Sequence, residues 1–211
     1  MRATALSGIC LLVFCAALNL SAQRYFTDIQ VKPTWSVDPG FSAPNEAQLT
    51  SGNVFKWLKI DVDYKTTPTK GNWMDNVTFQ YDILLPVKKG SPVVVLTGKI
   101  DYWAIPMDGK MHHAQAFVHP RFLQRYAPEL KFRGRELKDL RIRLIVKFND
   151  SGVGGGTSKP TTRSDPSKIA NEVQQAIASV RTVKVKNSIF SRNETPWAIL
   201  NIDFYELVKR K

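Results

Sequence analysis

The three histidines are the side chains best suited to bind a metal ion, and they lie in one short segment. His112, His113 and His119 occur in KMHHAQAFVHP. On an extended strand His113 and His119 would share a face, but six residues of strand separate them by roughly 20 Å, too far to share one ion. No HExxH spacing is present and no cysteine lies nearby. We therefore predict no metal site and no cofactor, and interpret these histidines as polar strand or loop residues.

Hydrolytic chemistry also lacks a sequence pattern. No serine occupies a GxSxG elbow, and the glycines at 154–156 lack the GxxxxGKS/T spacing of a phosphate loop. Acidic residues do alternate with apolar ones on expected strands, where paired carboxylates can hydrolyse a glycosidic bond. Solvated strand faces are the more common use of such residues. We predict that the protein is not an enzyme, and keep as an alternative a small hydrolase that uses carboxylates such as Asp61, Asp63, Asp82 and Asp101.

Positive charge is the unusual bulk property of the chain. Its 30 Lys and Arg outnumber 18 Asp and Glu, giving a formal net charge of +12. Basic side chains alternate with apolar ones on two expected strands, so we expect them to project from a sheet face. This face is a candidate surface for a polyanion such as an acidic glycan, whereas solubility and protection of strand edges are the alternative role. The candidate residues are Arg141, Arg143, Lys147, Lys184 and Lys186.

Two of the five tryptophans are candidates for contact with a glycan or a protein partner. Trp57 and Trp103 are out of phase with the apolar rows of their strands, so we expect both rings to point outward. An outward aromatic ring can stack on a sugar or pack against a partner. Packing at the rim of the fold is the structural alternative.

Residues 1–22 have the pattern of a cleavable secretory signal peptide. Arg2 precedes an apolar stretch from Ile9 to Leu18, and small residues end the segment. The stretch is roughly half of the ~20 residues that a spanning helix needs, so we expect no stable membrane anchor. We expect the mature chain, 23–211, to be secreted, periplasmic or at the cell surface, where it meets no intracellular nucleic acid.

Alternation of apolar and polar residues predicts the fold class. The pattern is clearest at 58–64, 77–85, 100–104 and 140–148, each of which predicts a half-buried strand. Both cysteines lie in the signal segment, so the mature chain must rely on a hydrophobic core. We predict one mainly β domain, a two-sheet sandwich. Weaker strand candidates are 29–35, 92–97, 115–118, 182–188 and 197–207.

A change of composition after Asp150 predicts a long flexible loop and then a helix. Residues 150–164 are rich in glycine, serine and threonine, and such chain loses much entropy on ordering. Asp165-Pro166 is typical of a helix start, and apolar spacing predicts one amphipathic helix over 166–180. A flexible joint at this place would permit strand exchange between copies and hence a homo-oligomer; a surface loop of a monomer is the alternative.

Over its whole length the chain resembles small secreted immunoglobulin-like proteins encoded with type IV pilus genes in mucin-degrading verrucomicrobia. The segments FKWLKIDVDY (55–64) and DNVTFQYDILLP (75–86) carry the resemblance, together with the signal sequence. It implies an immunoglobulin-like fold, a pilus-associated or cell-surface structural role with other surface or pilus proteins as partners, and no catalytic residues. The signal departs from the prepilin pattern, which speaks against a pilin proper. We expect a non-catalytic structural or interaction protein, with a glycan- or polyanion-binding module as the alternative.

Overall fold

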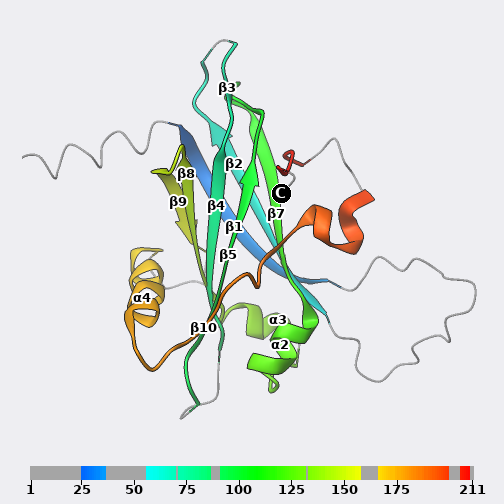
Figure 1. Cartoon of the computed structure of the whole chain (residues 1–211), viewed down its shortest axis with the longest axis vertical. Coiled ribbons are helices and arrows are strands. Elements are labelled where there is room, and N and C mark those ends of the chain that lie inside the picture. Colours follow the sequence, from blue (N-terminus) through cyan, green and yellow to red (C-terminus); the bar gives the residue numbers. More distant parts are fainter. Residues whose placement is uncertain are drawn as a thin grey trace, which may run out of the picture.

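Two packed β-sheets form the body of the molecule in the computed structural model (Figure 1). The structure describes residues 25–36, 56–69, 71–86, 91–131, 133–157, 166–199 and 205–209. The signal segment predicted at 1–22 lies outside these residues, as does 158–164 of the expected loop. Across the described ranges, no helix combines the length and hydrophobicity that a membrane crossing requires.

The first sheet has the strand order β1-β2-β7-β11, and the second has the order β10-β5-β4-β8-β9. All neighbours pair in antiparallel fashion except β10 and β5, which are parallel. A short β3–β6 ladder extends one end of the molecule. The strands are β1 (Phe26–Ser36), β2 (Trp57–Thr66), β3 (Trp73–Met74), β4 (Val77–Leu84), β5 (Val94–Tyr102), β6 (Ile105–Pro106), β7 (Met111–Val118), β8 (Arg141–Phe148), β9 (Ser151–Thr157), β10 (Val183–Val185) and β11 (Phe190–Ser191).

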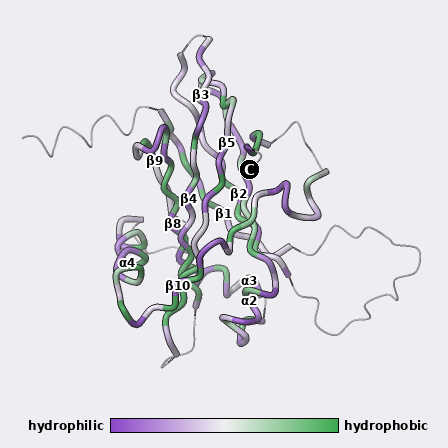
Figure 2. Tube along the Cα trace, viewed as in Figure 1, coloured by the Kyte–Doolittle hydropathy of each residue, from purple (hydrophilic) through white to green (hydrophobic). Residues whose placement is uncertain are grey.

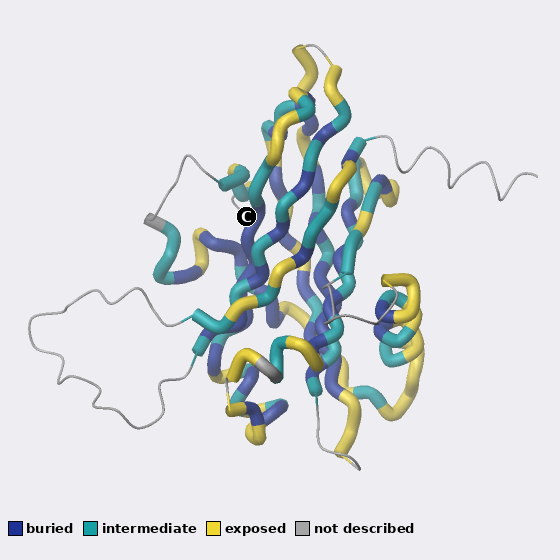
Figure 3. Tube along the Cα trace, turned by 180° about the vertical axis from the view of Figure 1, so that it is seen from behind, coloured by how far each residue is buried: buried dark blue, intermediate teal, exposed yellow. Residues whose placement is uncertain are grey.

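The core lies between the sheets because each central strand turns every second side chain inward. On β2 the residues Leu58, Ile60, Val62 and Tyr64 are fully buried, while the residues between them are partly exposed. The same alternation runs along β4 and β8. Figure 2 shows the matching alternation of hydrophobic and hydrophilic positions, and Figure 3 shows the alternation of burial. The mainly β, two-sheet prediction is confirmed.

The glycine-rich segment predicted as a flexible loop forms an edge strand instead. Residues Ser151–Thr157 make β9, which pairs with β8 and packs against β1 of the other sheet. A Cβ at Gly154 would lie 3.3 Å from Ile29 Cδ1, and one at Gly156 would lie 2.8 Å from Ile29 Cγ2. The glycines therefore let the two sheets approach at this edge, where Val153 is buried and the partly buried Ile29 packs against the core. The prediction of a loop over 150–164 was wrong for 151–157.

The amphipathic helix expected at 166–180 is present as α4 (Pro166–Ala178). Its apolar residues Ile169 and Val173 are buried, and the helix packs on the outer face of the second sheet, against β8, β4 and β5. Two further helices, α2 (Pro120–Tyr126) and α3 (Gly134–Leu137), were not predicted. The ring of His119 caps α2, since its Nδ1 accepts a hydrogen bond from the Arg121 backbone N–H at 3.1 Å.

The last described part of the chain joins the two sheets at the edge opposite β9. After β10 on the second sheet, β11 pairs with β7 on the first, and two 3₁₀ helices follow, η1 (Arg192–Glu194) and η2 (Pro196–Ile199). The strand expected at 197–207 is therefore helical at its start. Residues 205–209, here called the bridging segment, then bind both sheets: Glu206 N–H donates to His113 O at 3.0 Å, and Lys209 N–H donates to Asp101 O at 2.8 Å.

Candidate functional site

A buried histidine clamp holds the bridging segment to the first sheet. His112 Nε2 lies 2.9 Å from Asp108 Oδ1, and His112 Nδ1 lies 2.8 Å from Glu206 Oε1. The side chains of His112 and Glu206 are only 10% and 9% exposed. The imidazole also stacks on Tyr64, with ring centroids 5.5 Å apart. Asp108 precedes β7, His112 lies on β7, and Glu206 lies on the bridging segment, so the clamp joins parts of the chain far apart in sequence.

The two carboxylates favour the imidazolium form of His112. Burial lowers the pKa of His112, but the hydrogen bonds and charges of Glu206 and Asp108 outweigh it and raise the pKa above its ordinary value. At Asp108, burial raises the pKa, but the hydrogen bonds from the Lys110 backbone N–H and His112 outweigh this effect. The pKa of Asp108 is therefore lowered from its ordinary value. The result is an ion-paired triad that holds the bridging segment against β7.

Three fully buried tyrosines lie in the core beside the clamp. Tyr64, Tyr81 and Tyr102 are each at most 1% exposed. Burial raises the pKa of all three hydroxyls well above the ordinary value. Tyr102 donates its hydroxyl proton to Gln115 O at 3.2 Å, which links β5 of the second sheet to β7 of the first. The raised pKa keeps these hydroxyls protonated, and that of Tyr102 acts as a hydrogen-bond donor within the core.

A ladder of cross-strand contacts covers the outer face of the first sheet. Asp61 accepts a hydrogen bond from the Gln115 side chain at 2.7 Å, and Asp63 lies 2.7 Å from His113 Nδ1. Lys32 Nζ lies 2.6 Å from Asp63. Burial raises the pKa of Asp63, but the hydrogen bonds and charges of Lys32 and His113 outweigh this effect, so the pKa of Asp63 is lowered. Asp63 is thus held in its ionised form, and Asp61 is engaged in a hydrogen bond across the sheet.

The other two acids of the hydrolase alternative are also engaged within the chain. Asp82, which is 1% exposed, binds Arg143 Nη2 at 2.7 Å and Nε at 3.1 Å. Asp101 accepts a hydrogen bond from Thr78 Oγ1 at 2.6 Å. Among the described residues, no group of three or more His, Cys, Asp or Glu side chains is arranged to hold a metal ion.

The five cations predicted as one polyanion face do not lie together. Arg143 is committed to Asp82 and Gln174, and Arg141 pairs with Glu172 of α4 at 3.3 Å. The sheet order places β5 and β4 between β8, which carries Arg141, Arg143 and Lys147, and β10, which carries Lys184. The sequence shows that basic residues alternate with apolar ones on this strand. It does not show that Glu172 and Asp82 pair with Arg141 and Arg143. Lys184 and Lys186 are exposed.

The two candidate tryptophans differ in accessibility. Trp57 projects from the outer face of the first sheet but is only 6% exposed, because Trp197 and His119 cover it, with ring centroids 5.5 and 4.6 Å away. The expectation that Trp57 is available for contact was wrong, since the chain folds back over this face. Trp103 is 51% exposed.

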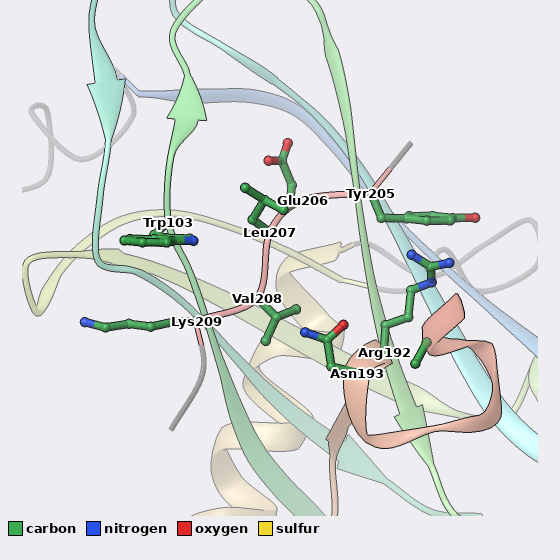
Figure 4. Close-up of a pocket in the computed structure, with 9 residues that line it drawn as sticks. Trp103, Arg192, Asn193, Tyr205, Glu206, Leu207, Val208 and Lys209 are labelled. Carbon is green, nitrogen blue, oxygen red and sulfur yellow. The ribbon is translucent and has the colours of Figure 1, made fainter. Parts of the chain in front are cut away.

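An open cavity of about 820 Å³ lies beside Trp103 and the bridging segment (Figure 4). The backbone N–H of Trp103 donates to the backbone carbonyl of Leu207 at 3.2 Å. Like Trp103, Leu207 is 51% exposed. On the far side, the guanidinium of Arg192 lies 4.7 Å over the ring of Tyr205. Sequence reasoning found Trp103 but missed Leu207 and Arg192, whose positions depend on where residues 190–199 and 205–209 lie relative to the two sheets. The lining residues are Trp103, Arg192, Asn193, Ala198, Tyr205, Glu206, Leu207, Val208 and Lys209.

Fold and site together define a mainly β sandwich domain with an open, partly apolar surface cavity. One protein-family model matches residues 21–211, which is most of the chain. The chain belongs to that family. No curated protein matches the chain. A crystal structure from Akkermansia muciniphila is similar, with a TM-score of 0.62 and 18% sequence identity over 88% of this chain and 95% of that chain. This similarity shows the fold.

Proposed function

We propose that this is a non-catalytic structural or interaction protein, exported to the periplasm or cell surface, where it works through protein contacts in a surface or pilus assembly. The observation that carries the proposal is the pair of half-exposed side chains, Trp103 and Leu207, beside an open cavity. Large apolar and aromatic side chains that stand together on a surface are typical anchors of protein interfaces.

The framework beneath the pair supports a role in contact. Trp103 and Leu207 are joined by a backbone hydrogen bond, and the neighbouring residue Glu206 is held by His112. Val208 pairs with Tyr102, whose side chain is fully buried. The surface is therefore presented on backbone that the core holds in place, which lowers the entropy cost of binding.

Site-specific cross-linking in the producing cells tests the proposal. A photo-reactive amino acid replaces Trp103, and the matched control carries it at Trp73, a 62% exposed tryptophan on β3. We expect adducts with one defined envelope protein from position 103 and none from position 73. Equal labelling at both positions, or no protein adduct from position 103, contradicts the proposal.

Export is tested separately. Fractionation of the same cells locates the protein, and mass spectrometry of the purified chain determines its first residue. We expect the protein in the envelope or medium with a chain that starts near Gln23. A cytoplasmic chain that keeps residues 1–22 contradicts the exported role.

A further inference from the structure

Three valines are exposed at one end of the molecule. Val180 is 99% exposed, Val183 is 40% exposed and Val93 is 39% exposed. We call these residues the valine tip. Val183 N–H donates to Val93 O at 2.8 Å, so the connection before β5 and the connection before β10 lie side by side. Figure 1 shows both at the lower end of the view, and Figure 3 shows the chain after α4 as largely exposed.

Packing within the chain does not account for a valine at position 180. The residue follows the end of α4, where Ser179 N–H still bonds to Gln175 O. The residue just beyond the C-terminal end of a helix is commonly glycine or asparagine, which can adopt the backbone conformation that ends the helix. A side chain that is 99% exposed contributes no burial in the folded chain.

Positive charge surrounds the valine tip. Arg181, Lys184 and Lys186 are exposed, and the described stretch 173–191 contains no acidic residue. None of the ion pairs found among the described residues involves these three cations. Arg141 and Arg143, by contrast, are neutralised under α4. The end of the molecule thus combines exposed apolar side chains with uncompensated positive charge.

We infer that the valine tip docks reversibly on an anionic lipid surface. Lysine and arginine are attracted to acidic headgroups, and small apolar side chains gain by entering the headgroup boundary. An acidic glycan would use the cations but would gain nothing from the valines, so the combination favours lipid. This contact lies beyond the proposed protein-binding surface, which involves Trp103 and Leu207.

Vesicle co-sedimentation of the purified protein tests the inference. We expect binding to vesicles that contain phosphatidylglycerol, and little binding to vesicles of phosphatidylcholine alone. The double change Lys184→Gln and Lys186→Gln should weaken binding roughly fivefold per charge removed. Val180→Ser combined with Val93→Ser should weaken it several-fold at unchanged charge. Lys99→Gln and Met111→Ser, both at exposed positions away from the tip, are the matched controls.

The outcomes separate lipid from other polyanions. The inference is overturned if the lysine variant binds acidic vesicles as wild type does, or if phosphatidylcholine alone binds equally well. It is also overturned if retention on heparin resin falls with the lysine changes while the serine changes leave vesicle binding intact, because a soluble polyanion is then the ligand. Circular dichroism and thermal unfolding confirm that each variant is folded.

Discussion

His112 Nδ1 lies 2.8 Å from Glu206 Oε1, so one side chain joins β7 of the first sheet to the segment that closes the sandwich. The opposite ring nitrogen binds Asp108 at 2.9 Å. Charge-assisted hydrogen bonds of this kind are stronger than neutral ones. The proposed contact surface at Leu207 begins one residue beyond Glu206, so its position depends on this clamp.

The clamp makes stability depend on pH. The folded state raises the pKa of His112 above its ordinary value of about 6.5. The stabilisation is therefore fully present below the ordinary pKa and is lost as the pH rises through the raised folded value. We expect the free energy of unfolding, measured by urea titration at constant ionic strength, to decrease over this interval. Glu206, Asp108 and Tyr64 are the titratable groups that face the ring.

The variant His112→Gln serves as the control for the pH series. Glutamine does not titrate, so the decrease above neutral pH should largely disappear. We also expect a loss of about 2 kcal/mol at acidic pH, since hydrogen bonds to charged groups contribute about 1.5–3 kcal/mol each. An unchanged pH slope in the variant would show that another group causes the dependence.

The buried pair of Arg143 and Asp82 should be sensitive to removal of one partner. Arg143→Met leaves the carboxylate of Asp82, 1% exposed, without its cation. Breaking a buried pair in this way costs about 3–5 kcal/mol. The double variant Arg143→Met with Asp82→Leu should recover most of that loss in chemical unfolding. A single variant as stable as wild type would contradict the pairing.

Gly156 should tolerate no larger side chain. Gly156→Val places a Cβ 2.8 Å from Ile29 Cγ2, and such overpacking costs about 1–3 kcal/mol. Ile29→Ala in the same chain should relieve part of the clash. Gly152→Ala is the matched control because no atom lies within 4 Å of its Cβ position. Thermal unfolding of the variants measures the difference, and equal losses at both glycines would contradict the role given to β9.

The two tryptophans should separate stability from contact. Trp57→Ala removes a buried ring that packs on Trp197 and His119, and we expect a loss of about 3–5 kcal/mol. Trp103→Ala alters a half-exposed ring, and we expect a change within about 0.5 kcal/mol. Urea unfolding followed by far-ultraviolet circular dichroism measures both. A large loss for Trp103→Ala would mean that its ring supports the fold.

Strand positions were predictable because burial on one face leaves a period of two in the sequence. Leu58 to Tyr64 show it plainly, and α4 was predictable from its apolar spacing and Pro166. The alternation of apolar and polar residues did not show which of the outward-pointing side chains would be covered by another part of the chain. Trp57 is outward yet buried, and Arg143 is outward yet paired, because residues distant in sequence fold over them.

Glycine was misinterpreted for a related reason. Composition predicts the entropy that residues 151–157 lose on ordering, but not the close approach of β1 that requires small residues there. The clamp was likewise hidden, since Asp108, His112 and Glu206 meet only after the chain crosses between sheets. Long-range contacts, which leave no local period, account for most of what was missed.

The pairing of β10, β11 and the bridging segment with the two sheets also sets an order of events during biosynthesis. A chain that emerges from its N-terminus presents β5 and β7 before β10, β11 and the bridging segment can pair with them. Until then both strands have unpaired edges, which are sites of aggregation. A product cut short before residue 183 would expose them permanently, and chaperones and proteases would recognise it as incomplete.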